Sequence, residues 1–316
     1  MDTHPRAADY LLRAAGCAEA NEQERKVAEA AEAGDAVAYY QAAESNGEAP
    51  GRWRGRGAQM LGFMPGDVAD PDAVRVLLGE LKDPRTGEYL GKPPKSYRSF
   101  EEIMSEKLRG VPADLIEERR RELYNEVKRA ARRACGFFDA TYSAPKSVSV
   151  YHAALRAEGR TAEAEAVAAA HRAGVEAAMR YLEEHGTWVR RGKHKSINGK
   201  GVGRRERGAG LITVEFDHST SRAEDPHLHT HVSIGNKTRA LSDGKWLAVD
   251  NKQWRHVKAI AASIYESVMA AEIETATDAR FEVREDGLGR EIAGFTARDL
   301  QESSNRTEET LAEQAR

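Results

Sequence analysis

The chain has 316 residues, of which 40% are hydrophobic and 31% charged, and its formal net charge is −3. These values indicate a globular protein with a sizeable core. No apolar run approaches the roughly 20 residues that a membrane helix needs, and the N-terminus has no signal-peptide core. The two cysteines, Cys17 and Cys135, lack the spacing of a metal site and would make a poor disulfide framework, which favours a reducing cytoplasm.

Two features come early in the chain. Residues 7–44 are rich in Ala and Glu at helical spacing and include the adjacent pair Tyr39 and Tyr40, which by itself is typical of amphipathic packing. Residues 51–58 combine three glycines with Trp53 and three arginines, a composition that suits a loop approaching phosphates and stacking a base; the alternative is a charged turn. The three arginines are Arg52, Arg54 and Arg56.

The next segment, residues 65–112, contains six prolines, and we expect it to be rich in loops. A helix is predicted over about 113–133, because Pro112 precedes it and an apolar stripe runs along it. The stripe consists of Leu115, Ile116, Leu123 and Val127.

Residues 137–142 are predicted to form a strand with one carboxylate, Asp139, among apolar neighbours. This aspartate is either a hydrogen-bonded structural residue or part of a site. The sequence from Ser143 to Ser147 then opens a helix with Pro145 near its first position. Because the first turn of a helix exposes backbone N–H groups, this end, with Lys146, suits a phosphate.

Helices are predicted at about 146–157 and 161–185, followed by a strand at 187–190 and a basic, glycine-rich hairpin over 191–210. Residues 190–207 carry eight Lys or Arg against one acidic residue, Glu206. This imbalance favours nucleic-acid binding, although a solvated charge run is the simpler alternative. The basic residues are Arg190, Arg191, Lys193, Lys195, Lys200, Arg204, Arg205 and Arg207.

Four of the ten histidines lie within fourteen residues, between two segments with strand character, 211–216 and 232–234. Side chains alternate along a strand, so His227, His229 and His231 share one face. His218 ends the preceding strand and could join them if the two strands pair. Converging imidazoles are good ligands for first-row metal ions, so a metal site is predicted here. The alternative is a pair of polar, half-exposed strands.

The remainder of the chain is predicted from turn and cap signals. Residues 241–247 resemble a hairpin, and a long helix is expected over about 252–277. A second hairpin is expected from 281–283 and 291–294, and Thr296 caps a final helix with Asp299 three residues on.

Taken in order, these motifs resemble a known family. The motifs are Tyr-Tyr, Gly-Arg-Trp-x-Gly-Arg-Gly-Ala, Asp-x-Thr-Tyr-Ser-Ala-Pro-Lys-Ser, Asp-His-x-Thr-Ser-Arg and His-Leu-His-Thr-His-Val. They resemble the N-terminal relaxase domain of conjugative relaxase–helicases, the three-histidine HUH endonucleases of the MobF/TrwC type. The likeness runs from about residue 35 to the C-terminus, so residues 1–34 are expected to be a helical extension and 35–316 the relaxase domain.

The resemblance implies an α+β fold, a two-layer sandwich with a central antiparallel sheet and helices packed on it. It implies a DNA strand transferase. A tyrosine would attack one phosphodiester of single-stranded DNA at an origin of transfer, leaving a 5′-phosphotyrosine link and a free 3′-hydroxyl, and the strand would later be rejoined. Accessory proteins of the relaxosome and the coupling protein of a type IV secretion system are the implied partners, without membrane insertion.

The resemblance also implies roles for particular residues. By motif position, His218, His229 and His231 would hold one divalent ion, Mg or Mn, with Zn, Ni or Co as alternatives. The family does not require a histidine at the position of His227. Asp139 would act as a base or orient a ligand histidine, and Tyr39, with Tyr40 beside it, would supply the nucleophile.

The sequence departs from the family pattern in having one tyrosine pair where many members have two, and the helicase half of the family is absent from these 316 residues. Three other functions fit the same residues. The chain could be a metal-dependent nuclease that activates water, a non-catalytic DNA-binding module, or a rolling-circle replication initiator of the same endonuclease class.

Overall fold

The computed structural model describes most of the chain between residues 50 and 303. The described residues are 50–94, 98–131, 135–197, 200–221, 225–284, 286–287 and 289–303. Tyr39, Tyr40 and the expected boundary between residues 34 and 35 lie outside them.

A four-stranded antiparallel sheet lies at the centre of the molecule, in the order β1-β5-β6-β2. Its strands are β1 (Arg52–Arg54), β2 (Phe137–Ser143), β5 (Thr213–Thr220) and β6 (Pro226–Gly235). In the pairing of β5 with β6, His218 lies opposite His229. The predicted α+β class with an antiparallel sheet is therefore confirmed.

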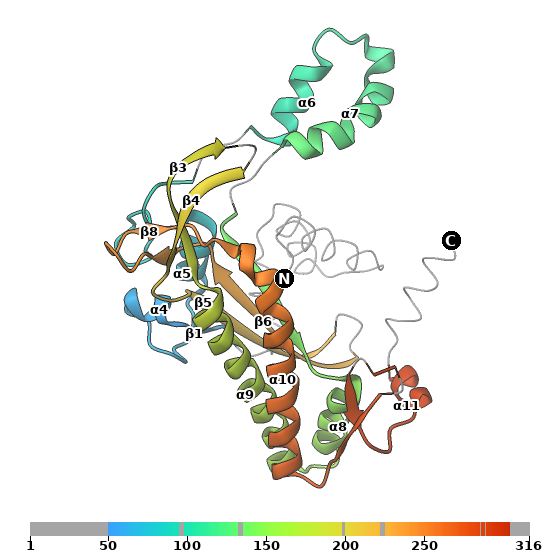
Figure 1. Ribbon diagram of the computed structural model, residues 1–316. Coiled ribbons are helices and arrows are strands. Elements are labelled where there is room, and N and C mark those ends of the chain that lie inside the picture. Colours follow the sequence, from blue (N-terminus) through green and yellow to red (C-terminus); the bar gives the residue numbers. More distant parts are fainter. Residues whose placement is uncertain are drawn as a thin grey trace.

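Three helices cover one face of this sheet: α8 (Lys146–Ala157), α9 (Thr161–Gly186) and α10 (Trp254–Ala276). Figure 1 shows α9 and α10 running side by side along the sheet. The main core forms where these helices meet alternate residues of the strands, such as Phe138, Val232 and Ile234. Gly174 allows the close approach of the two long helices, because a Cβ atom there would lie 2.8 Å from the backbone oxygen of Tyr265.

The other face of the sheet is partly covered by residues 56–79, most of which were predicted to form loops. Trp53, Val214 and Phe216 pack there against short helices, and the Trp53 ring stacks on Phe63 with centroids 4.2 Å apart. These helices are α4 (Arg56–Met60), α5 (Pro71–Val74) and the π-helical turn η1 (Arg75–Gly79). The expected loop at 51–58 is thus wrong, since its first half pairs with β5 as strand β1.

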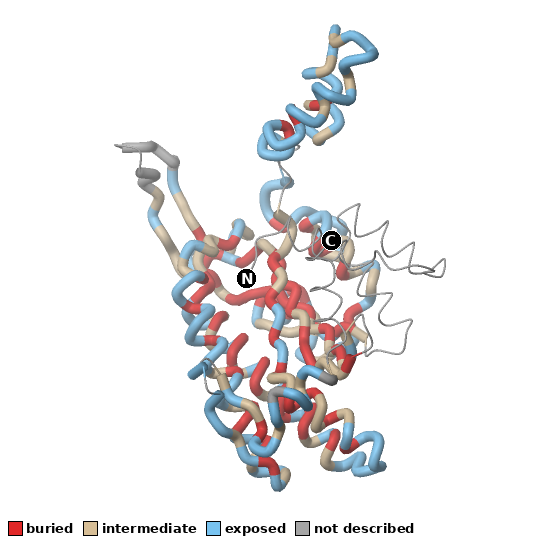
Figure 2. Tube along the Cα trace, turned by 90° about the vertical axis from the view of Figure 1, so that its right-hand side faces the viewer, coloured by how far each residue is buried: buried red, intermediate tan, exposed pale blue. Residues whose placement is uncertain are grey.

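Two helices stand away from this body, as Figures 1 and 2 both show. They are α6 (Phe100–Leu108) and α7 (Ile116–Ala130), which follows the 3-10 turn η2 (Ala113–Leu115). They share a small core of Met104, Leu123 and Val127. The prediction of α7 is confirmed, whereas α6 was missed within the proline-containing segment. Its signal was the capping box formed by Ser99 and Glu102.

The predicted basic hairpin is confirmed as a long ribbon of β3 (Trp188–Ile197) and β4 (Lys200–Arg207). Two shorter hairpins complete the chain, with the cap of the last helix at Thr296 as predicted. These elements are β7 (Thr238–Arg239), β8 (Trp246–Leu247), the 3-10 turn η3 (Asn251–Gln253), β9 (Phe281–Val283), β10 (Arg290–Ile292) and α11 (Ala297–Glu302). Within the described ranges, none of the helices has the length and apolar character needed to cross a bilayer.

Candidate metal centre

Three imidazole rings meet on the sheet face opposite α9 and α10. His218 comes from β5, and His229 and His231 come from β6, where alternation places both on the same side of the strand. The ring centroids lie 5.1 Å apart for His218 and His229, 5.6 Å for His218 and His231, and 5.2 Å for His229 and His231. The structure thus brings together the three histidines that the family resemblance implied as ligands.

This spacing can be compared with what one metal ion requires. A ligating imidazole nitrogen lies about 2.0–2.1 Å from the ion and its ring centre roughly 1.1 Å further, so tetrahedrally placed rings have centres about 5 Å apart. The three rings have that separation. Among the described residues, however, no three His, Cys, Asp or Glu side chains present their ligand atoms to one common point. The support for a site here is therefore the spacing of the three rings, which the pairing of β5 with β6 sets.

Hydrogen bonds fix which nitrogen of two of these rings can bind a metal ion. Nδ1 of His229 lies 2.8 Å from the backbone oxygen of His227, and Nδ1 of His231 lies 3.1 Å from Oδ2 of Asp139. Since a carbonyl and a carboxylate only accept, each Nδ1 carries the proton and donates it. In the neutral form of either ring the lone pair is therefore on Nε2, the arrangement in which an outer partner orients a ligand histidine.

Burial keeps two of the rings neutral. It lowers the pKa of His218 from 6.5 to about 4 and that of His229 from 6.5 to about 2, because the charged form is poorly solvated there. Neutral imidazoles are the form that ligates metal ions. The donor set and its spacing therefore fit a divalent first-row ion, with Asp139 behind His231.

The fourth histidine of the stretch, His227, has a different position. Its ring centroid is 4.4 Å from that of His229, and its backbone oxygen accepts the bond that orients His229. The contact of His227 with the cluster that these bonds show is thus through its main chain, and its exclusion from the ligand set stays a prediction.

Lys146 and the start of α8 are engaged within the protein. Nζ of Lys146 donates to the backbone oxygen of Pro226 at 3.0 Å, at the start of β6. Burial lowers the pKa of Lys146. The carboxylate of Glu291 accepts from the backbone N–H of Ser147 at 3.0 Å. The helix end that the sequence assigned to phosphate therefore holds a carboxylate from β10.

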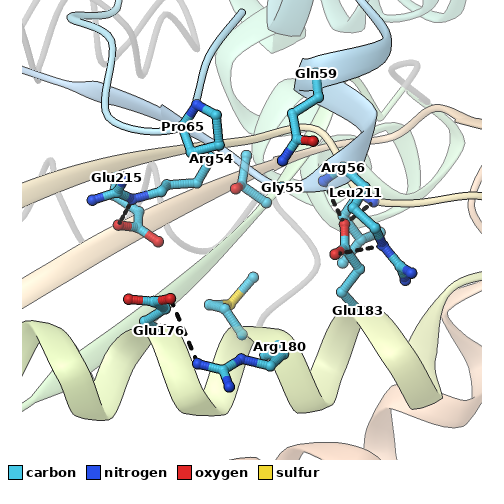
Figure 3. A pocket seen from close by; sticks show the side chains of 12 residues that line it. Arg54, Gly55, Arg56, Gln59, Pro65, Glu176, Arg180, Glu183, Leu211 and Glu215 are labelled. Carbon is cyan, nitrogen blue, oxygen red and sulfur yellow. Dashed lines mark hydrogen bonds and ion pairs between the residues drawn. The ribbon is translucent and has the colours of Figure 1, made fainter.

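Arg54 and Arg56 lie in the lining of a pocket of about 210 Å³ on the helix side of the sheet. Figure 3 shows the pairs inside it: Nε of Arg54 lies 3.3 Å from Oε2 of Glu215, and Nε of Arg56 lies 2.9 Å from Oε2 of Glu183. Burial raises the pKa of Glu215 from 4.5 to about 7, against the opposing effect of Arg54. This pocket is separate from the histidines, because Glu215 points to the other face of β5 from His218.

The base of the β3–β4 ribbon is also neutralised by acidic partners that are distant in sequence. Asp250 lies 3.1 Å from Arg190 and 2.9 Å from Arg205, whereas Arg191 pairs with Glu206 and Asp243. Arg204 is exposed, and Arg207 lies over the ring of Trp188 at 4.8 Å. The side chains of Lys193 and Lys195 lie outside the described part of the ribbon. Counting charges along the sequence therefore overstated the unpaired charge of this segment.

Sequence reasoning missed three buried polar residues behind the histidines: His171, Thr230 and Tyr265. His171 lies in the middle of an alanine-rich helix, and nothing in its sequence neighbourhood separates it from an ordinary core residue. Only the fold brings it to Thr230, 59 positions away.

Comparison with known proteins defines the class. A model of the TrwC relaxase family matches residues 7–316, so the chain belongs to the TrwC relaxase family. A metal-bound structure of the conjugative relaxase TrwC with oriT DNA superposes with a TM-score of 0.58 at 26% identity, covering 89% of this chain and 79% of that chain. A copper-bound TrwC structure with oriT DNA gives a TM-score of 0.58 at 25% identity, covering 88% and 78%.

The curated relatives are much longer than this chain. The multifunctional conjugation protein TraI of Escherichia coli (strain K12) is 27% identical over 227 residues, which is 71% of this chain and 10% of that protein. The chain thus spans about a tenth of the length of that relative. A further structure, TrwC with a 27-mer DNA that comprises the recognition hairpin and the cleavage site, has a TM-score of 0.56 at 26% identity, covering 89% and 78%.

Proposed function

We propose that this chain nicks single-stranded DNA at an origin of transfer by tyrosine transesterification and later rejoins the strand. One observation carries the proposal: three imidazoles converge from β5 and β6, with the carboxylate of Asp139 bonded to one of them. Membership of the TrwC family and the DNA complexes of TrwC support it.

The proposed reaction exchanges one phosphodiester for another. The phenolic oxygen of Tyr39 forms a bond to the scissile phosphorus, and the bond from phosphorus to the 3′-oxygen breaks. The phenol gives up its proton, and the departing 3′-oxygen takes one up to become a hydroxyl. Because the energy of the phosphodiester is conserved in the tyrosine ester, the same steps in reverse rejoin the strand.

His218, His229 and His231 would hold a divalent ion, for which we propose Mg²⁺ or Mn²⁺. Bound there, the ion would offset the charge that develops on the phosphate oxygens. The chain's own residues supply orientation. Asp139 accepts a hydrogen bond from Nδ1 of His231, which supports a role in orienting that ring.

The β3–β4 ribbon is the surface that we propose for the DNA flanking the cleavage site. Arg204 and the two lysines Lys193 and Lys195 are its proposed phosphate contacts, because the arginines at its base are held in ion pairs. Arg52 remains a candidate on β1. We also propose relaxosome accessory proteins and a coupling protein of a secretion system as partners, and the reducing cytoplasm as the location.

The test is covalent capture. The chain is incubated with Mn²⁺ and a randomised pool of labelled single-stranded DNA, and the products are separated under denaturing conditions. We expect a labelled protein band that protease removes, and sequencing of the captured strands should give one junction. Cleavage without labelled protein would contradict the proposal and support a nuclease that activates water. Binding without cleavage would support a DNA-binding module.

A further inference from the structure

A continuous chain of hydrogen bonds connects helices α10 and α9 to the two histidine strands. Nδ1 of His171 lies 2.8 Å from the hydroxyl of Tyr265, and Nε2 of His171 lies 2.9 Å from Oγ1 of Thr230. Oγ1 of Thr230 in turn donates to Oδ1 of Asp217 at 2.6 Å. Four residues from four elements are thus joined through the core.

The direction of every bond in this chain is determined. Thr230 has one hydroxyl proton and gives it to Asp217, so its oxygen must accept from Nε2 of His171. Burial lowers the pKa of His171 to about 3, so the ring is neutral and its Nδ1 must accept from the hydroxyl of Tyr265. Each donor therefore has one acceptor. Only the tautomer of His171 with its proton on Nε2 allows all three hydrogen bonds.

This series of hydrogen bonds lies deep in the protein. The exposed fraction is 1% for His171, 1% for Thr230 and 3% for Tyr265. The Tyr265 ring also packs edge-on to His171, with centroids 5.5 Å apart. Because water does not reach these groups, removing one hydroxyl leaves its neighbours without a replacement partner.

The series of hydrogen bonds ends at the cross-strand pair Asp217 and Thr230, which face each other in the register of β5 and β6. Asp217 precedes His218 in the sequence, and Thr230 stands between His229 and His231. Alternation along a strand points this pair toward the helices and the three histidines to the opposite face. The pair therefore holds, from behind, the backbone that carries all three rings.

We propose that Thr230 and His171 are positioning residues for the metal centre, and that this chain of hydrogen bonds sets the spacing of its three imidazoles. The inference rests on the proposed metal-binding role of His218, His229 and His231. A small displacement of either strand would move a ring by a comparable distance, and metal sites require ligands held within a few tenths of an ångström by the groups behind them.

The test substitutes the central hydroxyl. Thr230→Val keeps the shape and the branched Cβ of the side chain but removes both of its hydrogen bonds, whereas Thr230→Ser keeps the hydroxyl. Thr238→Val is the matched control. Thr238 is also fully buried, and its hydroxyl donates to the backbone oxygen of Gly210 at 2.7 Å, but it belongs to a different sheet. Affinity for Mn²⁺ is measured by calorimetry on metal-stripped protein, beside the midpoint of unfolding in urea.

We expect Thr230→Val to weaken Mn²⁺ binding by about 10–100-fold, the loss typical of an outer-shell partner, and Thr230→Ser to restore most of it. Thr238→Val should lower the unfolding midpoint to a similar extent and leave Mn²⁺ binding unchanged. Wild-type Mn²⁺ affinity in a folded Thr230→Val protein would overturn the inference. If the wild-type chain itself binds no Mn²⁺, or if His218→Ala binds it normally, the proposed metal site fails instead.

A second substitution keeps the inference testable if Thr230→Val does not fold. Tyr265→Phe retains the ring that packs on His171 and removes only the hydroxyl at the far end of the chain. We expect it to weaken Mn²⁺ binding severalfold, beyond any change in Thr238→Val. Mn²⁺ binding equal to that of the wild type would overturn the inference.

Discussion

At the scale of single residues, the hydrogen bonds of His229 and His231 decide which of their nitrogen atoms can bind a metal ion. His229 and His231 both donate from Nδ1, to a carbonyl and to a carboxylate, which leaves Nε2 as the ligand atom. His227 differs from these two residues in its contact with the cluster, because its backbone carbonyl accepts the hydrogen bond from His229.

The first prediction concerns the ligand set. His218→Ala, His229→Ala and His231→Ala should each nearly abolish metal-dependent cleavage, because two imidazoles cannot hold the ion in place. His227→Ala should have a mild effect, since its backbone oxygen remains. Single-turnover cleavage of labelled single-stranded DNA measures the difference. Equal losses at His227 and at the other three positions would show that the assignment is wrong.

The second prediction concerns Asp139. Asp139→Asn should lower the cleavage rate by about 10–100-fold and leave DNA affinity nearly unchanged, because the amide orients His231 less well than a carboxylate does. Asp70→Asn is the control: Asp70 caps α5, and asparagine caps equally well. Rate and affinity are measured on the same oligonucleotide. A fully active Asp139→Asn protein would make this residue structural.

At the scale of elements, the pairing of β5 with β6 places polar groups on both of its faces. The histidines lie on one face, and Asp217 and Thr230 lie on the other. Buried histidines that remain neutral make this part of the fold sensitive to acid, because the unfolded chain binds protons that the folded chain does not.

The third prediction follows from that difference. Burial lowers the pKa values of His171, His218 and His229 from 6.5 to about 3, 4 and 2. Below pH 6.5 the unfolded state therefore binds more protons, and stability falls as pH decreases toward about 4. The contribution of Glu215 to the pH dependence of stability has the opposite sign, because burial raises its pKa from 4.5 to about 7. Between those two pH values it offsets the contribution of one histidine.

The free energy of unfolding in urea, measured without metal between pH 7.5 and pH 4.5, tests this prediction. Each uncompensated histidine should contribute up to about 1.4 kcal/mol per pH unit. His171→Gln should flatten the curve by one such contribution. A stability that is constant from pH 6.5 to pH 4.5 would contradict the neutral state assigned to these rings.

The fourth prediction separates two neighbouring arginines of the ribbon. Arg204 is exposed, whereas Nε of Arg205 lies 2.9 Å from Asp250. Arg204→Gln should reduce the salt dependence of DNA binding by about one unit of slope, as expected for one lost phosphate contact. Arg205→Gln should leave the slope unchanged. If the two substitutions reduce the slope equally, the ion pair with Asp250 opens when DNA binds.

Most of the long helices and strands could be predicted from the sequence, whereas short elements that depend on tertiary contacts could not. Local patterns predicted β2, α8, α9 and α10, and glycine-rich composition predicted the ribbon, because each of these signals lies within its own segment. These signals missed α6, whose short apolar stripe lies between prolines, and took β1 for a loop. Strand β1 has three residues and depends on its pairing with β5, which no local signal contains. Charge counting failed at the ribbon for the same reason, since Asp243 and Asp250 arrive from elsewhere in the chain.

At the scale of the whole molecule, the sheet separates two chemically different regions. One face carries the three imidazoles, and the other carries α9 and α10 with the buried chain of hydrogen bonds that reaches Asp217. The ribbon and the α6–α7 pair extend beyond this body, as Figure 1 shows. Under the proposed function, such projecting elements suit a long substrate such as DNA.

The most direct test of the account is the identity of the covalent link. The fifth prediction is that the chain, incubated with Mn²⁺ and the strand recovered by covalent capture, carries a nucleotide on Tyr39 after nuclease and protease digestion and mass spectrometry. Tyr39→Phe should lose the adduct and keep single-strand binding, since only the attacking oxygen is removed, whereas Tyr40→Phe should retain both. An adduct on Tyr40 would correct the choice within the pair. Persistent cleavage by the double variant Tyr39→Phe/Tyr40→Phe would contradict the account.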